Sequence, residues 1–135
     1  MNNAAIYTGT DFAPWKIPHK AQGILINSYA NKHGKQIDFV INEGIFFDSY
    51  SRMRSLMETR PVEELFFTSI FQLPQKNKLE DFLGMVDGKI IYFALEELYG
   101  DSEYLINVVY KNLELFRGAG SYKSKYEVID FYKNI

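Results

Sequence analysis

The chain has 135 residues, 47% of them hydrophobic and 24% charged, enough for one globular domain that buries about 65–70% of its unfolded surface. The absence of cysteine excludes disulfides and thiolate chemistry. A net charge of −2, a pI near 5.7 and no basic stripe indicate that nucleic acid is not a partner. No apolar run reaches the ~18 residues of a membrane span, so we expect a cytoplasmic protein with no membrane partner.

The first half of the chain alternates strand and helix patterns. The apolar run Ala4–Thr8 predicts the first strand, and Asp11–Pro14 has the composition of a loop. A proline suited to a first helical turn begins the predicted helix Pro18–Lys32, and Gly34 is placed to close it. Gln36–Ile41 follows as the second strand, because its apolar side chains alternate.

The second half continues the alternation, starting with a helix over residues 50–60 that Asp48 or Ser49 could cap. The later elements are a strand in Leu65–Pro74, a helix over Lys78–Val86, a strand over Lys89–Leu95 and a helix that starts at Asp101 or Ser102. This β-α alternation predicts an α/β domain, with a mostly parallel four-stranded sheet and helices on both faces.

The segment after residue 117 differs from the rest in composition. A glycine-rich linker precedes Ser124–Glu127, which matches a capping box, and an aromatic amphipathic pattern follows. We therefore divide the chain into an α/β domain over residues 1–117 and an extension over 118–135 with a C-terminal helix. The aromatic face of that helix must be buried on this chain or on a second copy, which makes a homodimer one hypothesis.

Motifs for metals and cofactors do not occur in the sequence. His19 and His33 are not paired at helix-face spacing, and no acidic loop has the spacing of a cation site. Neither a glycine-rich dinucleotide motif, nor a phosphate loop, nor a nucleophile elbow is present. We therefore expect no metal and no cofactor.

Polar residues follow each predicted strand, and parallel strands bring such residues to one edge of a sheet. His19 and Gln22 near the start of the first helix join the same edge, beside amides that favour anions. We predict Glu43 and His19 as a catalytic acid–base pair. The predicted substrate-binding residues are Thr8, Thr10, Gln22, Ser69, Gln72 and Glu96.

A structural interpretation stands beside the functional one. Threonine and serine at strand ends often only form turns. Gln72 could bond backbone amides in the turn before Pro74, and His19 could be an ordinary turn residue. Glu43 is the hardest to explain this way, because a carboxylate that follows a buried strand needs a partner.

Several of these positions resemble a known family, the sporadic carbohydrate cluster proteins, which are encoded among genes for surface polysaccharides. The resemblance spans roughly residues 6–98. It rests on Ile17-Pro18-His19, Gln22, Ile26–Ala30, Gly34, Glu43, Ser69–Pro74 and Tyr92–Glu96. It implies a biosynthetic setting without a defined reaction. The chain departs from the family after the first strand, where Thr8–Asp11 replaces a Ser-Ser-Arg run and so lacks its arginine.

The layout also resembles, distantly, the catalytic domain of serine recombinases. That resemblance implies a nucleophile at the end of the first strand, where this chain has Thr8 or Thr10. It also implies arginines after the third strand, where this chain has Phe71–Pro74. The likeness is therefore expected to be one of fold.

Three functional hypotheses follow. The first is a protein of surface-glycan biosynthesis that binds or modifies a sugar or sugar nucleotide by cofactor-free acid–base chemistry, as an epimerase or isomerase does. The second is a non-catalytic accessory protein of a carbohydrate-biosynthesis complex. The third is a nucleic-acid module of recombinase descent, which the acidic pI disfavours. The sequence leaves open whether the chain is an enzyme.

Overall fold

The computed structural model describes residues 2–9, 11–12, 14–43, 50–74 and 78–115. Contacts divide the chain into two units, Met1–Ser102 and Glu103–Ile135, which are described separately. The predicted cap residues Asp48 and Ser49, the site residue Thr10 and the extension over 118–135 with its proposed dimer helix all lie outside the described residues.

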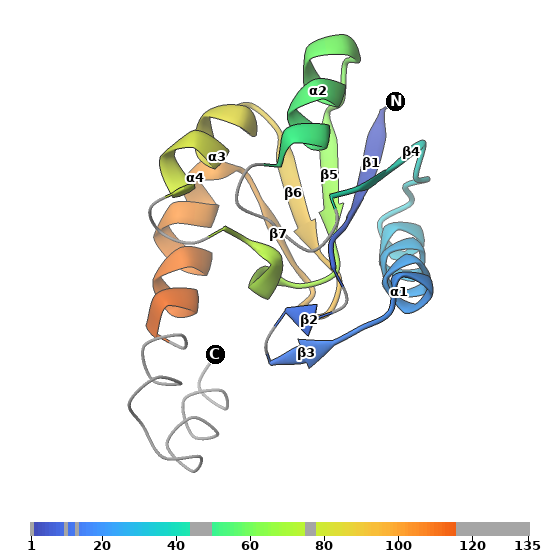
Figure 1. The fold of residues 1–135 in the computed structure, drawn as a ribbon, viewed down its shortest axis with the longest axis horizontal. Coiled ribbons are helices and arrows are strands. Elements are labelled where there is room, and N and C mark those ends of the chain that lie inside the picture. The colour runs from blue at the N-terminus through green and yellow to red at the C-terminus, as the bar shows by residue number, and fades with distance from the viewer. Residues whose placement is uncertain (1, 10, 13, 44–49, 75–77, 116–135) are drawn as a thin grey trace. The chain divides into compact units, whose positions relative to one another are not determined.

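A five-stranded sheet forms the centre of the first unit (Figure 1). Four neighbouring strands of this sheet are parallel. The last strand is antiparallel to its neighbour. In spatial order the strands are β4 (Phe39–Asn42), β1 (Asn3–Tyr7), β5 (Glu64–Phe67), β6 (Ile90–Phe93) and β7 (Leu98–Gly100).

Helices cover both faces of this sheet, as expected when parallel strands are joined by crossovers (Figure 1). They are α1 (His19–Lys32), α2 (Ser51–Thr59) and α3 (Leu79–Met85). The described part of the second unit is helical: α4 (Ser102–Tyr104) is followed by the π-helical η3 (Leu105–Tyr110) and by helix over 111–115. No helix among the described residues is long and apolar enough to cross a membrane.

Aromatic side chains build the core on both faces, because consecutive strand residues point in opposite directions. Phe66 stacks on Tyr92 at 4.2 Å between ring centroids, in the cluster that α1 covers. Their neighbours Phe67 and Phe93 stack at 5.8 Å on the other face, where Phe67 also meets Phe82 of α3. The aromatic-rich composition thus supplies the buried area of a small domain.

The predicted α/β class with helices on both faces is confirmed, and two details of the strand prediction are wrong. A small antiparallel hairpin, β2 (Asp11–Phe12) with β3 (Trp15–Lys16), stands where a loop was expected. β7 adds a fifth strand to the predicted four. Strands of two and three residues are too short to produce an alternation pattern.

The central segment Leu65–Pro74 also divides differently from the prediction of one long strand. The strand ends at Phe67, and the next residues enter η1, a 3₁₀ turn over Ile70–Gln72. Ser69 caps this turn, and all residues of the segment are buried. The apolar run therefore reflects burial rather than strand length.

Candidate functional site

The parallel strands end at one edge, and there the structure brings most of the predicted site residues together. Thr8, Gln22, Ser69 and Gln72 are each 0% exposed, so they form a buried polar network. Their side chains come from the end of β1, from α1 and from the turn η1. Buried polar groups are tolerated only when their hydrogen bonds are made, so the pairing of each atom decides what the network can do.

Gln72 lies at the centre of this network and uses both ends of its amide. Its Oε1 accepts from the backbone amides of Thr68 at 2.7 Å and Ser69 at 3.0 Å, which completes a capping box around η1. Its Nε2 donates to Thr8 Oγ1 at 2.8 Å and to Gln22 Oε1 at 3.3 Å. Gln72 therefore joins two strand ends and α1.

Gln22 fixes the other side of Thr8. Its Oε1 accepts from the Thr8 amide at 3.2 Å, while its Nε2 donates to the carbonyls of Thr8 at 3.2 Å and Ile17 at 2.9 Å. Every polar atom of this amide side chain is thus engaged with backbone or with Gln72. The end of β1 is bound to the start of α1 through these contacts.

Glu96 closes the network beside β6. Its Oε2 accepts from Ser69 Oγ at 2.6 Å and its Oε1 accepts from the Ile70 amide at 3.0 Å. Burial raises the pKa of this carboxyl above its usual value of 4.5, and the bonds from Ser69 and Ile70 oppose that rise. The Ser69 hydroxyl also accepts from the Phe71 amide at 3.2 Å.

The two predicted catalytic residues, His19 and Glu43, form hydrogen bonds with different partners. His19 Nε2 is 2.7 Å from the Thr8 carbonyl, which can only accept, so Nε2 carries the hydrogen. In the neutral ring Nδ1 is then an acceptor, 3.5 Å from Asn42 Nδ2. Glu43 instead accepts hydrogen bonds from the backbone amides of Arg52 at 3.1 Å and Met53 at 2.8 Å, so it caps the start of α2.

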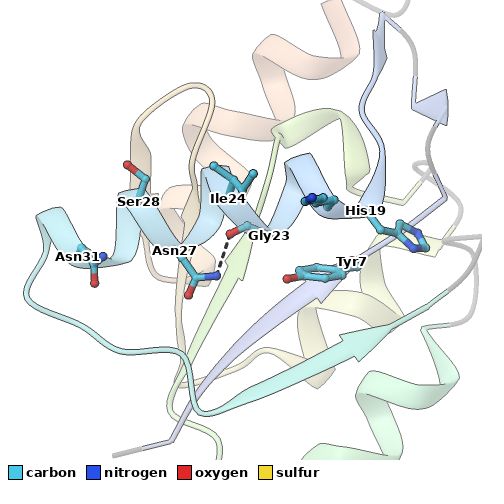
Figure 2. A pocket seen from close by; sticks show the side chains of 8 residues that line it. Tyr7, His19, Gly23, Ile24, Asn27, Ser28 and Asn31 are labelled. Atoms are coloured by element: carbon cyan, nitrogen blue, oxygen red, sulfur yellow. Dashed lines mark hydrogen bonds between the residues drawn. The ribbon is translucent and has the colours of Figure 1, made fainter.

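A groove runs beside this edge and contains residues that the sequence analysis missed (Figure 2). It has a volume of about 680 Å³ and lies open along one side of α1. Its lining residues are Tyr7, His19, Lys20, Gly23, Ile24, Asn27, Ser28 and Asn31. The available sequence signal was Gly23, because a glycine inside a helix often marks a close approach.

Metal binding has no support at this edge or elsewhere in the described part of the chain. No group of three or more histidine, aspartate or glutamate side chains is arranged there to hold an ion. The carboxylates of Glu43 and Glu96 are occupied by protein donors.

Neither a family model nor a curated protein matches the chain. Solved structures do match it, at low sequence identity. The N-terminal catalytic domain of TP901-1 integrase aligns with a TM-score of 0.60 and 14% identity, covering 90% of this chain and all of that domain. The C-terminal catalytic domain of ISC1926 TnpA, an IS607-like serine recombinase, aligns with a TM-score of 0.51 and 15% identity, covering 98% and 95%.

These matches show a fold likeness to the catalytic domains of an integrase and of a serine recombinase. They confirm the predicted fold likeness and give no support to membership of the carbohydrate cluster family. The prediction of a sugar-binding or sugar-modifying function is therefore wrong, since the structural neighbours are recombination proteins. The exclusion of nucleic acid as a partner is wrong for the same reason. That exclusion rested on net charge, which does not report the local arrangement of cations.

Proposed function

We propose that this chain is a recombinase-fold domain that binds nucleic acid and does not perform strand transfer through Thr8 or Ser69. The fold likeness to an integrase and a recombinase supports the partner class. A cytoplasmic location, predicted from the sequence, fits such a partner.

The buried network supports the absence of strand transfer at these two hydroxyls. A nucleophilic hydroxyl must reach a phosphate and a base that takes its proton. Thr8 and Ser69 are each 0% exposed, and their hydroxyl groups are hydrogen-bonded within the protein. Opening the network to admit a phosphate would leave several buried amides unpaired.

The start of α1 carries the binding half of the proposal. Lys16 and Lys20 are exposed on either side of the turn that enters this helix, and the first turn contains no acidic residue. Arg52 is also exposed at this edge, where its Nη1 donates to the Asn42 carbonyl at 2.9 Å. Cations beside helix amides attract phosphates, so these three exposed cations offer phosphate contacts at an edge where the carboxylates of Glu43 and Glu96 already accept bonds from protein donors.

Fluorescence anisotropy with a labelled DNA strand, titrated at several salt concentrations, tests the binding. We expect weak binding, with a Kd of about 10⁻⁴ to 10⁻⁶ M at physiological salt, and a log–log salt slope that Lys20→Gln reduces by about one. Lys78→Gln is the matched control, because Lys78 is an exposed lysine at the N-cap of α3, whose first turn carries Glu80 and Asp81. The absence of binding even at low salt would overturn the proposal.

A second assay isolates the catalytic half. The protein is incubated with duplex DNA. The mixture is then denatured and run on a gel that separates covalent protein–DNA adducts from free DNA. We expect all the DNA to run free. An adduct that maps to Thr8 or Ser69 would show that the network opens, and would refute this half while leaving the binding half standing.

A further inference from the structure

The groove along α1 has an aromatic floor. Tyr7 is the last residue of β1, and its ring lies beneath the helix at Gly23 (Figure 2). A Cβ at position 23 would come within 2.5 Å of the Tyr7 hydroxyl and 3.3 Å of the adjoining ring carbon. Only glycine therefore permits this ring position without a shift of the Tyr7 side chain.

A second ring stands at one end of the groove. The His19 and Tyr7 ring centroids are 6.1 Å apart and their planes are tilted by 38°. The bond from His19 Nε2 to the Thr8 carbonyl holds the imidazole in place. The groove thus contains two aromatic rings in a defined relative orientation.

Polar groups and one cation rise from the exposed side of α1 above these rings. Asn27 Nδ2 donates to the Gly23 carbonyl at 2.8 Å, so the amide oxygen Oδ1 is the end that can accept from a ligand. Ser28 and Asn31 follow on the next turn, and Lys20 precedes them. All four of these side chains are exposed, so the groove is open along its length.

The length and volume of the groove fit a segment of a linear polymer ligand. From His19 to Asn31 the helix advances about 18 Å, at 1.5 Å per residue. The volume of about 680 Å³ lies within the ~300–1,000 Å³ of ordinary ligand sites. Aromatic rings for stacking, amides for base edges and a lysine for phosphate are the set of groups that unpaired nucleotides use.

We propose that this groove binds an unpaired base of a nucleic-acid strand, stacked on Tyr7, with Lys20 at the adjoining phosphate. The proposal rests on the proposed nucleic-acid function and adds a preference for single strands. It assigns Tyr7 and Gly23 to the binding site, and it separates base contacts in the groove from phosphate contacts at the exposed cations.

The test compares three labelled probes in the anisotropy assay: a 12-nucleotide single strand, the same sequence as a duplex, and a single strand with abasic positions at its centre. We expect the intact single strand to bind most tightly. Tyr7→Leu should weaken it about 5-fold to 150-fold, the range for loss of one base stack, while Tyr7→Phe retains it. Equal affinity for the abasic strand would overturn the proposal.

Gly23→Ala provides a second variant that removes no binding group. The added methyl displaces the Tyr7 ring, so single-strand affinity should fall towards that of Tyr7→Leu. Gly84→Ala is the matched control, because Gly84 also lies in a helix and its Cβ would meet nothing within 4 Å. If Gly23→Ala does not fold, as judged by circular dichroism, the Tyr7 pair decides the question.

Two outcomes distinguish this inference from the proposed function. If Lys20→Gln lowers the salt slope but Tyr7→Leu and Gly23→Ala bind as the wild type does, the function stands and the groove proposal is refuted. If no probe binds at any salt concentration, the proposed function fails and the groove proposal fails with it.

Discussion

Tyr7 and Thr8 are neighbours in the chain, yet they belong to two regions that use polar groups in opposite ways. Thr8 enters a network with Gln22 and Gln72 in which each member is fully buried. Tyr7 faces a groove whose polar side chains are exposed. One region closes the strand ends, whereas the other carries Lys20, Asn27, Ser28 and Asn31 on an exposed helix side.

The comparison shows why polar residues at strand ends are a weak guide to function. Four of the predicted site residues are present at this edge because the turn and the strand ends need hydrogen-bond partners. We infer that their first role is to hold β1, β5 and α1 together. The groups that can meet a ligand lie on the exposed side of α1, where composition and spacing give little signal.

Removing the Gln72 amide should produce the largest loss of stability. Gln72→Ala leaves the buried Thr68 and Ser69 amides and the Thr8 hydroxyl without this partner, at about 1–3 kcal/mol for each unsatisfied group. We expect the free energy of unfolding in urea to fall by about 3 kcal/mol. Gln36→Ala, at an exposed side chain, should change it by less than about 0.5 kcal/mol. A loss below about 1 kcal/mol for Gln72→Ala would refute the structural role.

Glu96 should make the network sensitive to pH. Its pKa is raised in the folded state, so the folded protein holds this proton more tightly than the unfolded chain does. The associated stability is complete below the usual value of 4.5 and is lost as the pH rises through the folded pKa, by at most ~1.4 kcal/mol per pH unit.

The measurement for Glu96 is a series of urea denaturations from pH 4 upwards, on the wild type and on Glu96→Gln. Subtracting the two curves isolates this group from the other carboxyls. We expect the wild type to lose stability relative to the variant as the pH rises above 4.5. Parallel curves would mean that Glu96 is not desolvated in the fold.

The sequence predicted the parts of the fold that have long periodic patterns. α1 was expected over Pro18–Lys32 and is found over His19–Lys32, and Gly34 has the positive φ of 68° expected after a helix. Burial on α1 does not follow hydrophobicity alone: the apolar Ile24 is 62% exposed, whereas Gln22 and Gly23 are buried. An apolar pattern cannot reveal that Gln22 has backbone partners at Thr8 and Ile17.

The sequence predicted that these polar side chains meet at one edge, whereas their binding and catalytic roles stay predictions. Thr8, Gln22, Ser69, Gln72 and Glu96 do converge, because parallel topology alone brings strand ends together. Whether their hydrogen bonds are all made depends on the direction in which each side-chain amide points. The spacing of residues in a sequence carries no information about that direction. The roles predicted for Glu43 and His19 stay predictions, and the contacts add a structural role for each.

Glu43 separates the catalytic interpretation from the capping one. Glu43→Ala should lower the free energy of unfolding by about 1 kcal/mol, because two first-turn amides of α2 lose a charged acceptor. Glu58→Ala, an exposed change in the last turn of the same helix, is the control and should be neutral or slightly stabilising. Stability equal to that of the wild type for Glu43→Ala would leave capping without support.

The smallest expected effect distinguishes the floor of the groove from an ordinary helix surface. Gly84→Ala should stabilise the protein by about 0.5–1 kcal/mol, because alanine favours the helix and the added methyl meets only open space. Gly23→Ala should gain nothing or lose stability, because the same propensity gain is offset by moving the Tyr7 ring. Melting curves of both variants measure the difference. If Gly23→Ala were as stabilising as Gly84→Ala, Tyr7 would have to be free to leave the groove floor, and stacking on a fixed ring would lose its structural basis.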